Sequence, residues 1–239
     1  MDIQLDIKNT MNKAIGVCTK FGEFWKGMEF PGSIGPAVSY LLIIGLLPAV
    51  GFFFSSLMWF LGFLISGVSG GYIMTYFFGS VLIYPVLFFA FWVAMPVVMG
   101  ILLAAVDPAM NINKGDANSY TTVLAYSITP AAVASLAASV VTGLGGFLTL
   151  ATGAFGIFWL FNLIAIVVGL AGGIIALIQL YNGYTQGLET DSGQAIILMV
   201  IQFFAYLIVG AIVFGIFFAI FRTGYMGFGG FGGFGGFWR

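Results

Sequence analysis

The sequence has no histidine, a single cysteine and very few charged residues. Charged side chains make up 6% of its 239 residues and hydrophobic ones 61%, whereas a soluble domain carries about 25% charged residues. Without histidine, the chain lacks the usual proton shuttle at neutral pH and the commonest metal ligand. Cys18 has no second cysteine with which to form an internal disulfide. We therefore expect no zinc site, no histidine-dependent catalysis and no cofactor.

The scarcity of charge also limits the partners of the chain. The net charge is −1, so no strong field attracts a polyanion, and no cluster of lysine and arginine carries interleaved aromatic residues. Nucleic acid is therefore excluded as a partner. The mean hydropathy of +1.12 leaves too little polar surface to cover a globule in water. The composition predicts one membrane domain.

Long charge-free stretches separate the charged residues, which lie within positions 2–29, 107–116, 189–191 and 222–239. About 20 apolar residues cross a hydrocarbon layer of ~30 Å as a helix. We predict five spans, at about 36–66, 72–105, 120–142, 154–181 and 193–221, with turns at 67–71 and 142–153. Pro48, Pro85 and Pro96 are expected to kink the first two spans. Splitting the first span at Pro48 would leave a piece too short to cross.

The predicted fold class is all-α: a polytopic membrane helix bundle of five transmembrane helices, preceded by an amphipathic interfacial helix. The N-terminal segment covers residues 1–30, the five-helix domain 31–222 and a tail rich in glycine and phenylalanine 223–239. We expect this tail to be flexible, or else to adhere to the outer interface or a neighbour. Five lysines precede or separate the first three spans, against two arginines near the C-terminus, so the positive-inside rule predicts a cytoplasmic N-terminus.

Before the first span, apolar residues recur at the three- and four-residue spacing of an amphipathic helix. They are Ile7, Met11, Ala14, Cys18, Phe21, Trp25 and Met28. Two interpretations are open. Either the helix lies in the cytoplasmic interface, with Trp25 toward lipid and Lys13, Lys20 and Lys26 toward headgroups, or it packs on the protein's own loops.

The polar residues of the spans favour packing over chemistry. No carboxylate lies deep in a predicted span, so an ion-coupled pump is not expected. Asn162, Gln179 and Gln202 are predicted to hydrogen-bond between helices. Asp107, Lys114 and Asp116 lack the ligand spacing of a calcium loop, so we expect a solvated connector there and no metal site. Two small-residue stripes favour close helix contact, within the chain or between copies: Gly169 with Gly173, and Ala134 with Ala138.

Three stretches resemble the Ypt/Rab-interacting protein family, also called the YIP domain family. The first is Phe24-Trp25 with Pro31. The second is the run 120–130, in which Tyr126 precedes the membrane-embedded Pro130, and the third is 181–184 with 192–195, which contains Gly183 and Ala195. The resemblance covers about residues 20–221. It implies five helices, a cytoplasmic N-terminus and an outward C-terminus.

Members of that family are not known as enzymes and bind small GTPases, vesicle coats and one another. The chain lacks the long N-terminal region that carries much of this binding, so we do not expect those partners. The prediction is a non-enzymatic scaffold or adaptor in a prokaryotic or archaeal plasma membrane, which associates with lipids, copies of itself or other membrane proteins. An accessory subunit of a larger membrane complex and a transport or channel component are the alternatives.

Overall fold

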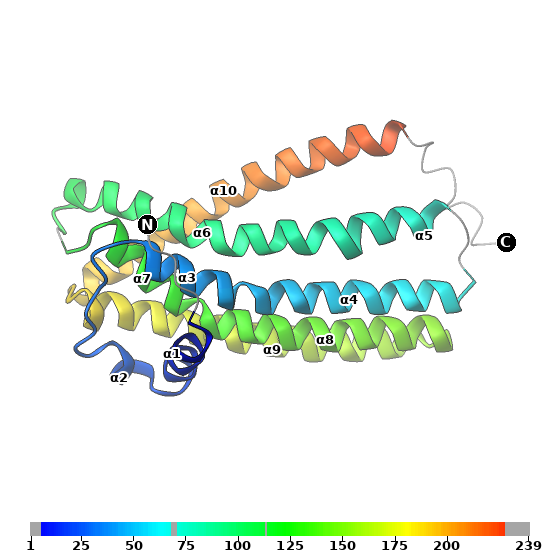
Figure 1. Cartoon of the computed structure of the whole chain (residues 1–239), viewed down its shortest axis with the longest axis horizontal. Coiled ribbons are helices and arrows are strands. Elements are labelled where there is room, and N and C mark those ends of the chain that lie inside the picture. The colour runs from blue at the N-terminus through cyan, green and yellow to red at the C-terminus, as the bar shows by residue number, and fades with distance from the viewer. Residues whose placement is uncertain (1–5, 68–70, 113, 228–239) are drawn as a thin grey trace. The chain divides into compact units, whose positions relative to one another are not determined.

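The computed structural model describes residues 6–67, 71–112 and 114–227, and these ranges contain helices and no strand. The chain forms two compact units, Met1–Ile196 and Ile197–Arg239. Five helical stretches are long and apolar enough to cross a membrane (Figure 1). They are Gly35–Ile65, Phe77–Val106, Ala117–Thr152, Phe155–Gly187 and Ser192–Ile212. The predicted all-α class and the predicted number of spans are confirmed.

The first candidate span consists of α3 (Gly35–Ile44) and α4 (Leu46–Ile65), which meet at Gly45. Pro48 has no N–H to give to the carbonyl of Ile44, four residues earlier, and its ring crowds that carbonyl. The predicted irregularity at Pro48 therefore appears three residues upstream. Gly67, with a φ of 76°, follows the end of α4, and the rest of the predicted turn lies partly outside the described residues.

The second candidate span, Phe77–Val106, contains two kinds of helix. It follows α5 (Gly71–Tyr76), begins as the π-helix η1 (Phe77–Ile83) and continues as α6 (Tyr84–Val106). The π-helix ends just before Pro85, and Pro96 lies inside α6. A wider helical turn leaves room for a proline ring that a regular α-helix would not accommodate. After α6, the short 3-10 helix η2 (Pro108–Met110) leads into the connector.

The third candidate span begins at a well-formed cap. Asp116 accepts hydrogen bonds from the backbone N–H of Ser119 at 2.8 Å and from its hydroxyl at 2.7 Å. These bonds to the ionised carboxylate hold the pKa of Asp116 below its ordinary value. Helix α7 (Ala117–Ser127) follows and gives way to α8 (Thr129–Thr152) at Ile128, two residues before Pro130.

The turn predicted at 142–153 is wrong over 142–152, because α8 continues through these residues to Thr152, and it is correct only at Gly153, whose φ is 71°. The glycines provide close helix packing instead. A Cβ added at Gly143 would lie 2.7 Å from Ser55 Cα, and one at Gly146 would lie 2.6 Å from Trp59 Nε1. The missing side chains let α4 approach α8 closely.

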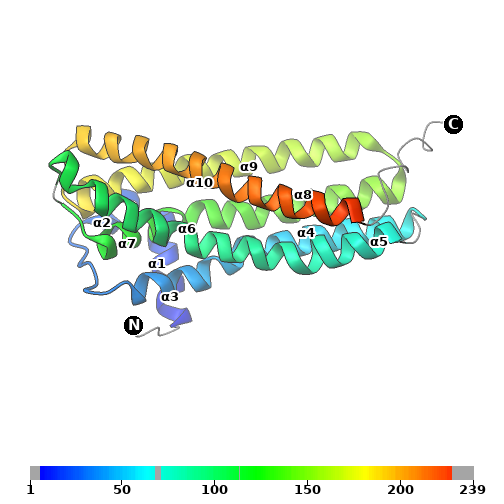
Figure 2. The ribbon, with the colours of Figure 1, turned by 90° about the horizontal axis from the view of Figure 1, so that it is seen from above.

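Helix α9 (Phe155–Asn182) is followed by the π-helix η3 (Gly183–Gly187). Helix α8 lies between α4 and α9 (Figures 1 and 2). One close contact of α8 with α9 is made at Gly172, where an added Cβ would overlap Ala134 Cβ and lie 2.9 Å from the Pro130 carbonyl oxygen. The predicted alanine stripe thus takes part at Ala134, whereas added Cβ atoms at Gly169 and Gly173 would meet nothing within 4 Å.

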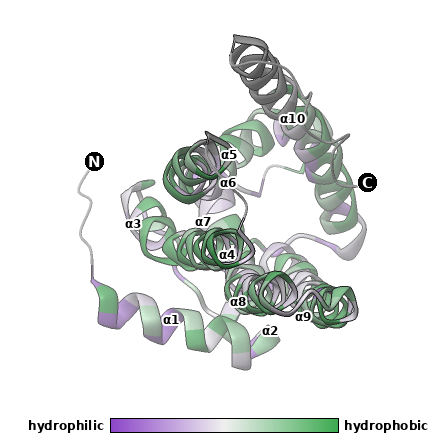
Figure 3. Ribbon diagram, turned by 90° about the vertical axis from the view of Figure 1, so that its right-hand side faces the viewer, coloured by the Kyte–Doolittle hydropathy of each residue, from purple (hydrophilic) through white to green (hydrophobic). Residues whose placement is uncertain are grey.

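The N-terminal segment contains α1 (Ile7–Thr19) and α2 (Phe21–Trp25). Asp6 caps α1 by accepting a hydrogen bond from the Asn9 backbone N–H at 2.9 Å. Figure 1 shows α1 almost end-on, and Figure 3 shows it lengthwise, so α1 runs across the direction of the spans. This orientation is the one that a helix parallel to a membrane plane would have.

Helix α10 (Ser192–Gly227) contains the fifth candidate span and extends into the second unit. It continues through residues 223–227, which we expected to belong to the tail. The remainder of the predicted glycine- and phenylalanine-rich tail lies outside the described residues.

Gly172→Ala should destabilise the protein by about 1–3 kcal/mol, because the new methyl group overlaps backbone-anchored atoms that cannot move aside. Gly173→Ala is the matched control, since an added Cβ there meets open space and alanine favours a helix over glycine by ~1 kcal/mol. Reversible unfolding in mixed detergent micelles measures both. Equal stability of the two variants would contradict the proposed contact between α8 and α9.

Candidate functional site at the junction of the N-terminal segment and the bundle

Trp25 fixes the N-terminal segment to the spans. Its side chain is 0% exposed, and its indole Nε1 donates a hydrogen bond to Gln179 Oε1 of α9 at 2.8 Å. The Gln179 amide in turn donates to the backbone carbonyl of Val17 in α1. A single buried amide therefore joins α1 and α2 to the fourth candidate span.

Two glycines of η3 make room for the indole ring. A Cβ added at Gly183 would lie 3.2 Å from Trp25 Cη2, and one at Gly187 would lie 3.3 Å from Trp25 Cε3. The Gly183 position also faces Val123 of α7, with 2.7 Å to its Cγ1. A π-helix has a wider turn than an α-helix. The wider turn of η3, which follows α9, leaves room for the indole ring. Contact with the indole gives a structural reason for glycine at position 183, which the sequence singled out only through the family resemblance.

Tyr126 of α7 is the centre of an aromatic cluster beside Trp25. Its ring centroid lies 4.5 Å from that of Tyr40 and 5.6 Å from that of Phe24, in edge-to-face arrangements that favour aromatic pairs. Lys13 of α1 donates to the Tyr126 hydroxyl at 3.1 Å, with its ammonium 5.5 Å from the ring centroid. The Tyr40 hydroxyl is bonded to Thr129 Oγ1 at 2.6 Å. Residues from α1, α2 and α3 therefore converge on one phenol of α7.

Helix α1 has two different faces. Thr10, Ala14 and Val17 are buried against the bundle, whereas Ile7, Met11 and Ile15 are 65%, 48% and 57% exposed. We call the exposed set (Ile7, Met11 and Ile15) the outer stripe. Since residues four apart lie on one side of a helix, the outer stripe forms a continuous apolar strip beside the packed face.

The prediction that Trp25 faces lipid is therefore not supported, because this side chain is enclosed by Gln179, Gly183 and Gly187. Of the other candidate interfacial residues, Lys20 and Lys26 are exposed, and Lys13 is half-buried against Tyr126. The two interpretations of the amphipathic segment apply to different faces: one face packs on the protein and the outer stripe is open.

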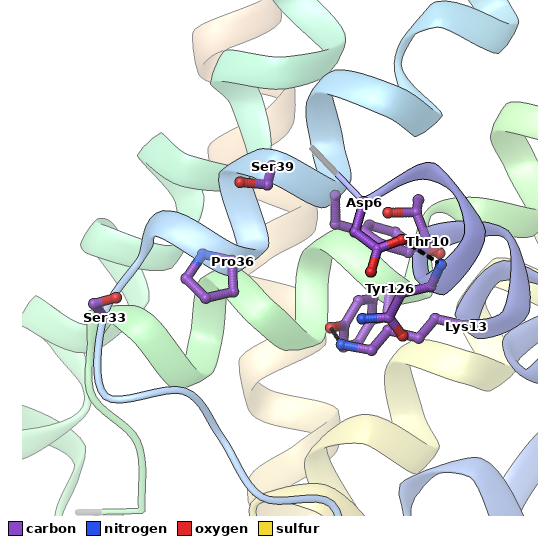
Figure 4. A pocket seen from close by; sticks show the side chains of 9 residues that line it. Asp6, Thr10, Lys13, Ser33, Pro36, Ser39 and Tyr126 are labelled. Carbon is purple, nitrogen blue, oxygen red and sulfur yellow. Dashed lines mark hydrogen bonds between the residues drawn. The ribbon is translucent and has the colours of Figure 1, made fainter. Parts of the chain in front are cut away.

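A cavity of about 400 Å³ lies between α1, the entry to α3 and α7. Asp6, Thr10 and Lys13 line it from α1 and Tyr126 from α7, while Ser33, Pro36 and Ser39 line it from the chain that enters α3 (Figure 4). Its wall carries one acidic and one basic side chain among hydroxyl and amide groups. This volume falls in the range of small-molecule sites, about 300–1,000 Å³.

Asp107, expected in a solvated connector, is only 1% exposed. Its Oδ2 accepts backbone hydrogen bonds from Lys114 at 3.1 Å and Gly115 at 3.2 Å. Such bonds satisfy part of a buried carboxylate and close the loop between the second and third spans. Within the described residues no group of three or more Asp, Glu, Cys or His side chains could hold a metal ion.

The remaining predicted residues have structural positions. Pro130 is buried in the first turn of α8, and Ala195 is fully buried at the start of α10. Asn162 bonds to the carbonyl of Phe158 in its own helix at 2.8 Å, not to another helix as expected. Burial raises the pKa of the Cys18 thiol, which disfavours its reactive thiolate.

Sequence reasoning missed Tyr40 and the direction in which Gln179 points. Gln179 was identified as a hydrogen-bonding residue of a span, and its position four residues before Gly183 places both on one side of α9. That spacing was the available signal for the indole site.

The five candidate spans define a multi-pass membrane protein. The chain matches no protein-family model, and neither a curated protein nor a solved structure shows a significant match.

Trp25→Phe should lower the free energy of unfolding by about 1–3 kcal/mol, because the buried Gln179 oxygen loses its donor. Combining it with Gln179→Leu should cost less than the sum of the single changes, since the unpaired groups are removed together. Reversible unfolding of the two single variants and the double variant measures the free energies for this double-mutant cycle. Hydrogen exchange over residues 7–19 shows whether α1 is released from the bundle.

The control for this cycle is Trp159→Phe, because Trp159 is 71% exposed on α9 and should change stability by no more than ~0.5 kcal/mol. Strict additivity of the Trp25 and Gln179 substitutions would show that the indole–amide bond does not couple the two segments.

Proposed function

We propose that the chain is a non-enzymatic, YIP-like scaffold or adaptor that organises membrane or partner proteins, with α1 as its presenting element. The observation that supports this most directly is the pairing of a fixed inner face with an open outer stripe on α1. A helix held by buried contacts loses little conformational freedom when it binds, so its outer stripe is pre-organised for a partner.

The direction of α1 agrees with this role. It runs across the spans (Figure 3), as expected of a helix that lies in the membrane interface with an apolar strip toward acyl chains. The distribution of lysines favours the cytoplasmic side for this helix, as in the YIP-like arrangement. Lipids and membrane-bound partners are the ligands that such a surface would meet.

The accessory-subunit alternative has its own support. Added Cβ atoms at Gly169 and Gly173 of α9 would meet nothing within 4 Å, and Leu163, Leu170 and Ile174 of the same helix are exposed. Small residues between large ones are typical of faces that pack on another transmembrane helix. A stoichiometric partner chain bound there would make this alternative the better description.

Replacing the outer stripe tests the scaffold. Ile7→Ser, Met11→Ser and Ile15→Ser together should remove the lipids or proteins enriched with the wild-type chain in native-membrane nanodiscs, as measured by quantitative mass spectrometry. The buried contacts of α1 stay intact, so thermal stability should change little. Asn12→Ser with Thr19→Ser is the matched control, since both positions are exposed on α1 outside the outer stripe.

An unchanged set of associated molecules in the outer-stripe variant would contradict the scaffold. Ion or solute flux in liposomes that contain only this protein would instead favour the transport or channel alternative. Retention of one partner at fixed stoichiometry by every α1 variant would favour the accessory subunit.

A further inference from the structure

We propose that the cavity between α1, α3 and α7 binds the zwitterionic headgroup of a membrane phospholipid, with Lys13 at its phosphate and Asp6 at its amine. The proposal rests on the charges and position of the cavity, and it shares with the scaffold function only the outer stripe of α1 as a surface for lipid chains.

The basic end of the cavity has spare donors. The Lys13 ammonium carries three N–H groups, and its hydrogen bond to the Tyr126 hydroxyl at 3.1 Å takes one of them. Two can turn toward a phosphate oxygen, where charge-assisted hydrogen bonds are strong. The Tyr126 hydroxyl holds the ammonium at the wall and thereby orients it for a ligand.

The acidic end provides a complementary site for an amine. Asp6 Oδ1 accepts the Asn9 backbone N–H at 2.9 Å, and a carboxylate has about four lone-pair positions, so it can also accept from an ammonium.

The presence of both charges in one cavity favours a zwitterion. Asp6 caps α1 and Lys13 lies seven residues further on, about two helical turns, so the two residues lie on nearly the same side of α1. A simple anion at Lys13 would leave Asp6 without an opposite charge, and a simple cation at Asp6 would leave Lys13 without one. A headgroup with both charges would satisfy both residues, whose side chains are labelled in Figure 4.

The position of the cavity favours a lipid over a soluble zwitterion. Pro36, in its wall, belongs to the first turn of the first candidate span. Spans of 31 and 36 residues measure about 46–54 Å as helices, longer than a hydrocarbon layer of ~30 Å, so their ends reach headgroup level. The outer stripe of α1 begins at Ile7, next to Asp6, and offers an apolar surface for the acyl chains.

Native mass spectrometry of the detergent-purified full chain tests the proposal, with phosphatidylethanolamine and phosphatidylglycerol of the same acyl chains as probes. The wild type should retain phosphatidylethanolamine at least about tenfold better. Lys13→Gln should weaken retention of both lipids by about tenfold or more, as expected for loss of a charge-assisted hydrogen bond. Asp6→Asn should abolish the preference between them.

The variants are matched to separate binding from folding. Asparagine is as good a helix cap as aspartate, so Asp6→Asn removes the charge and keeps α1 capped, and it remains informative if Lys13→Gln fails to fold. Lys20→Gln removes an exposed lysine from the C-terminal end of the same helix and should leave retention of both lipids unchanged.

Three results would overturn the proposal. Equal retention of the two lipids by the wild type would show that Asp6 does not bind the amine of the headgroup. An equal loss of retention in Lys20→Gln and Lys13→Gln would indicate non-specific attraction. Displacement of the lipid by soluble phosphoethanolamine at equal concentration would show that the cavity prefers a free zwitterion to a lipid.

Discussion

The hydrogen bond from the Trp25 indole to the Gln179 amide is the interaction on which the arrangement of the N-terminal segment depends. Both groups are fully buried, and leaving either unpaired in such a place costs about 1–3 kcal/mol. Displacement of the indole would leave two polar groups without a partner, the indole N–H and Gln179 Oε1. The amide nitrogen of the same Gln179 donates to the Val17 carbonyl, so this side chain also holds α1. The segment is therefore held as part of the bundle, and the outer stripe and the polar cavity both follow from that attachment.

Glycine has two distinct roles in this architecture. In α8 and α9, Gly143, Gly146 and Gly172 remove side chains where helices cross closely, as is typical of helices that pack without a hydrophobic driving force. In η3, Gly183 and Gly187 make space for one indole ring.

Proline acts through its missing N–H, and the helix breaks at Gly45 and Ile128 lie three and two residues before Pro48 and Pro130. The spans are thus irregular at positions that the sequence determines.

The sequence was sufficient for the fold class and the number of candidate spans, because length and hydropathy are properties of a single segment. It was insufficient wherever a residue type serves two purposes. Gly143 and Gly146 have the composition of a turn, yet they pack inside α8, and only the neighbouring helix distinguishes these uses. The buried position of Asp107 likewise depends on Lys114 and Gly115 folding back over it.

The candidate site was predictable in its parts and not in its assembly. Trp25, Tyr126, Gly183 and Lys13 were all identified from the sequence, but their mutual contacts join segments more than 100 residues apart. An amphipathic pattern shows that one side of a helix avoids water and does not show whether lipid or protein covers it. In α1 the pattern combined a packed face with the adjacent outer stripe, so the two interpretations could not be separated in advance.

The most direct test of the attachment is the fluorescence of Trp25 alone, with the tryptophans at 59, 92, 159 and 238 replaced by phenylalanine and the protein reconstituted in bilayers. The indole enclosed by Gln179, Gly183 and Gly187 should be shielded both from a water-soluble quencher and from quenchers attached to lipid chains. Strong quenching by the lipid-attached groups would place Trp25 in the membrane interface and contradict the buried junction.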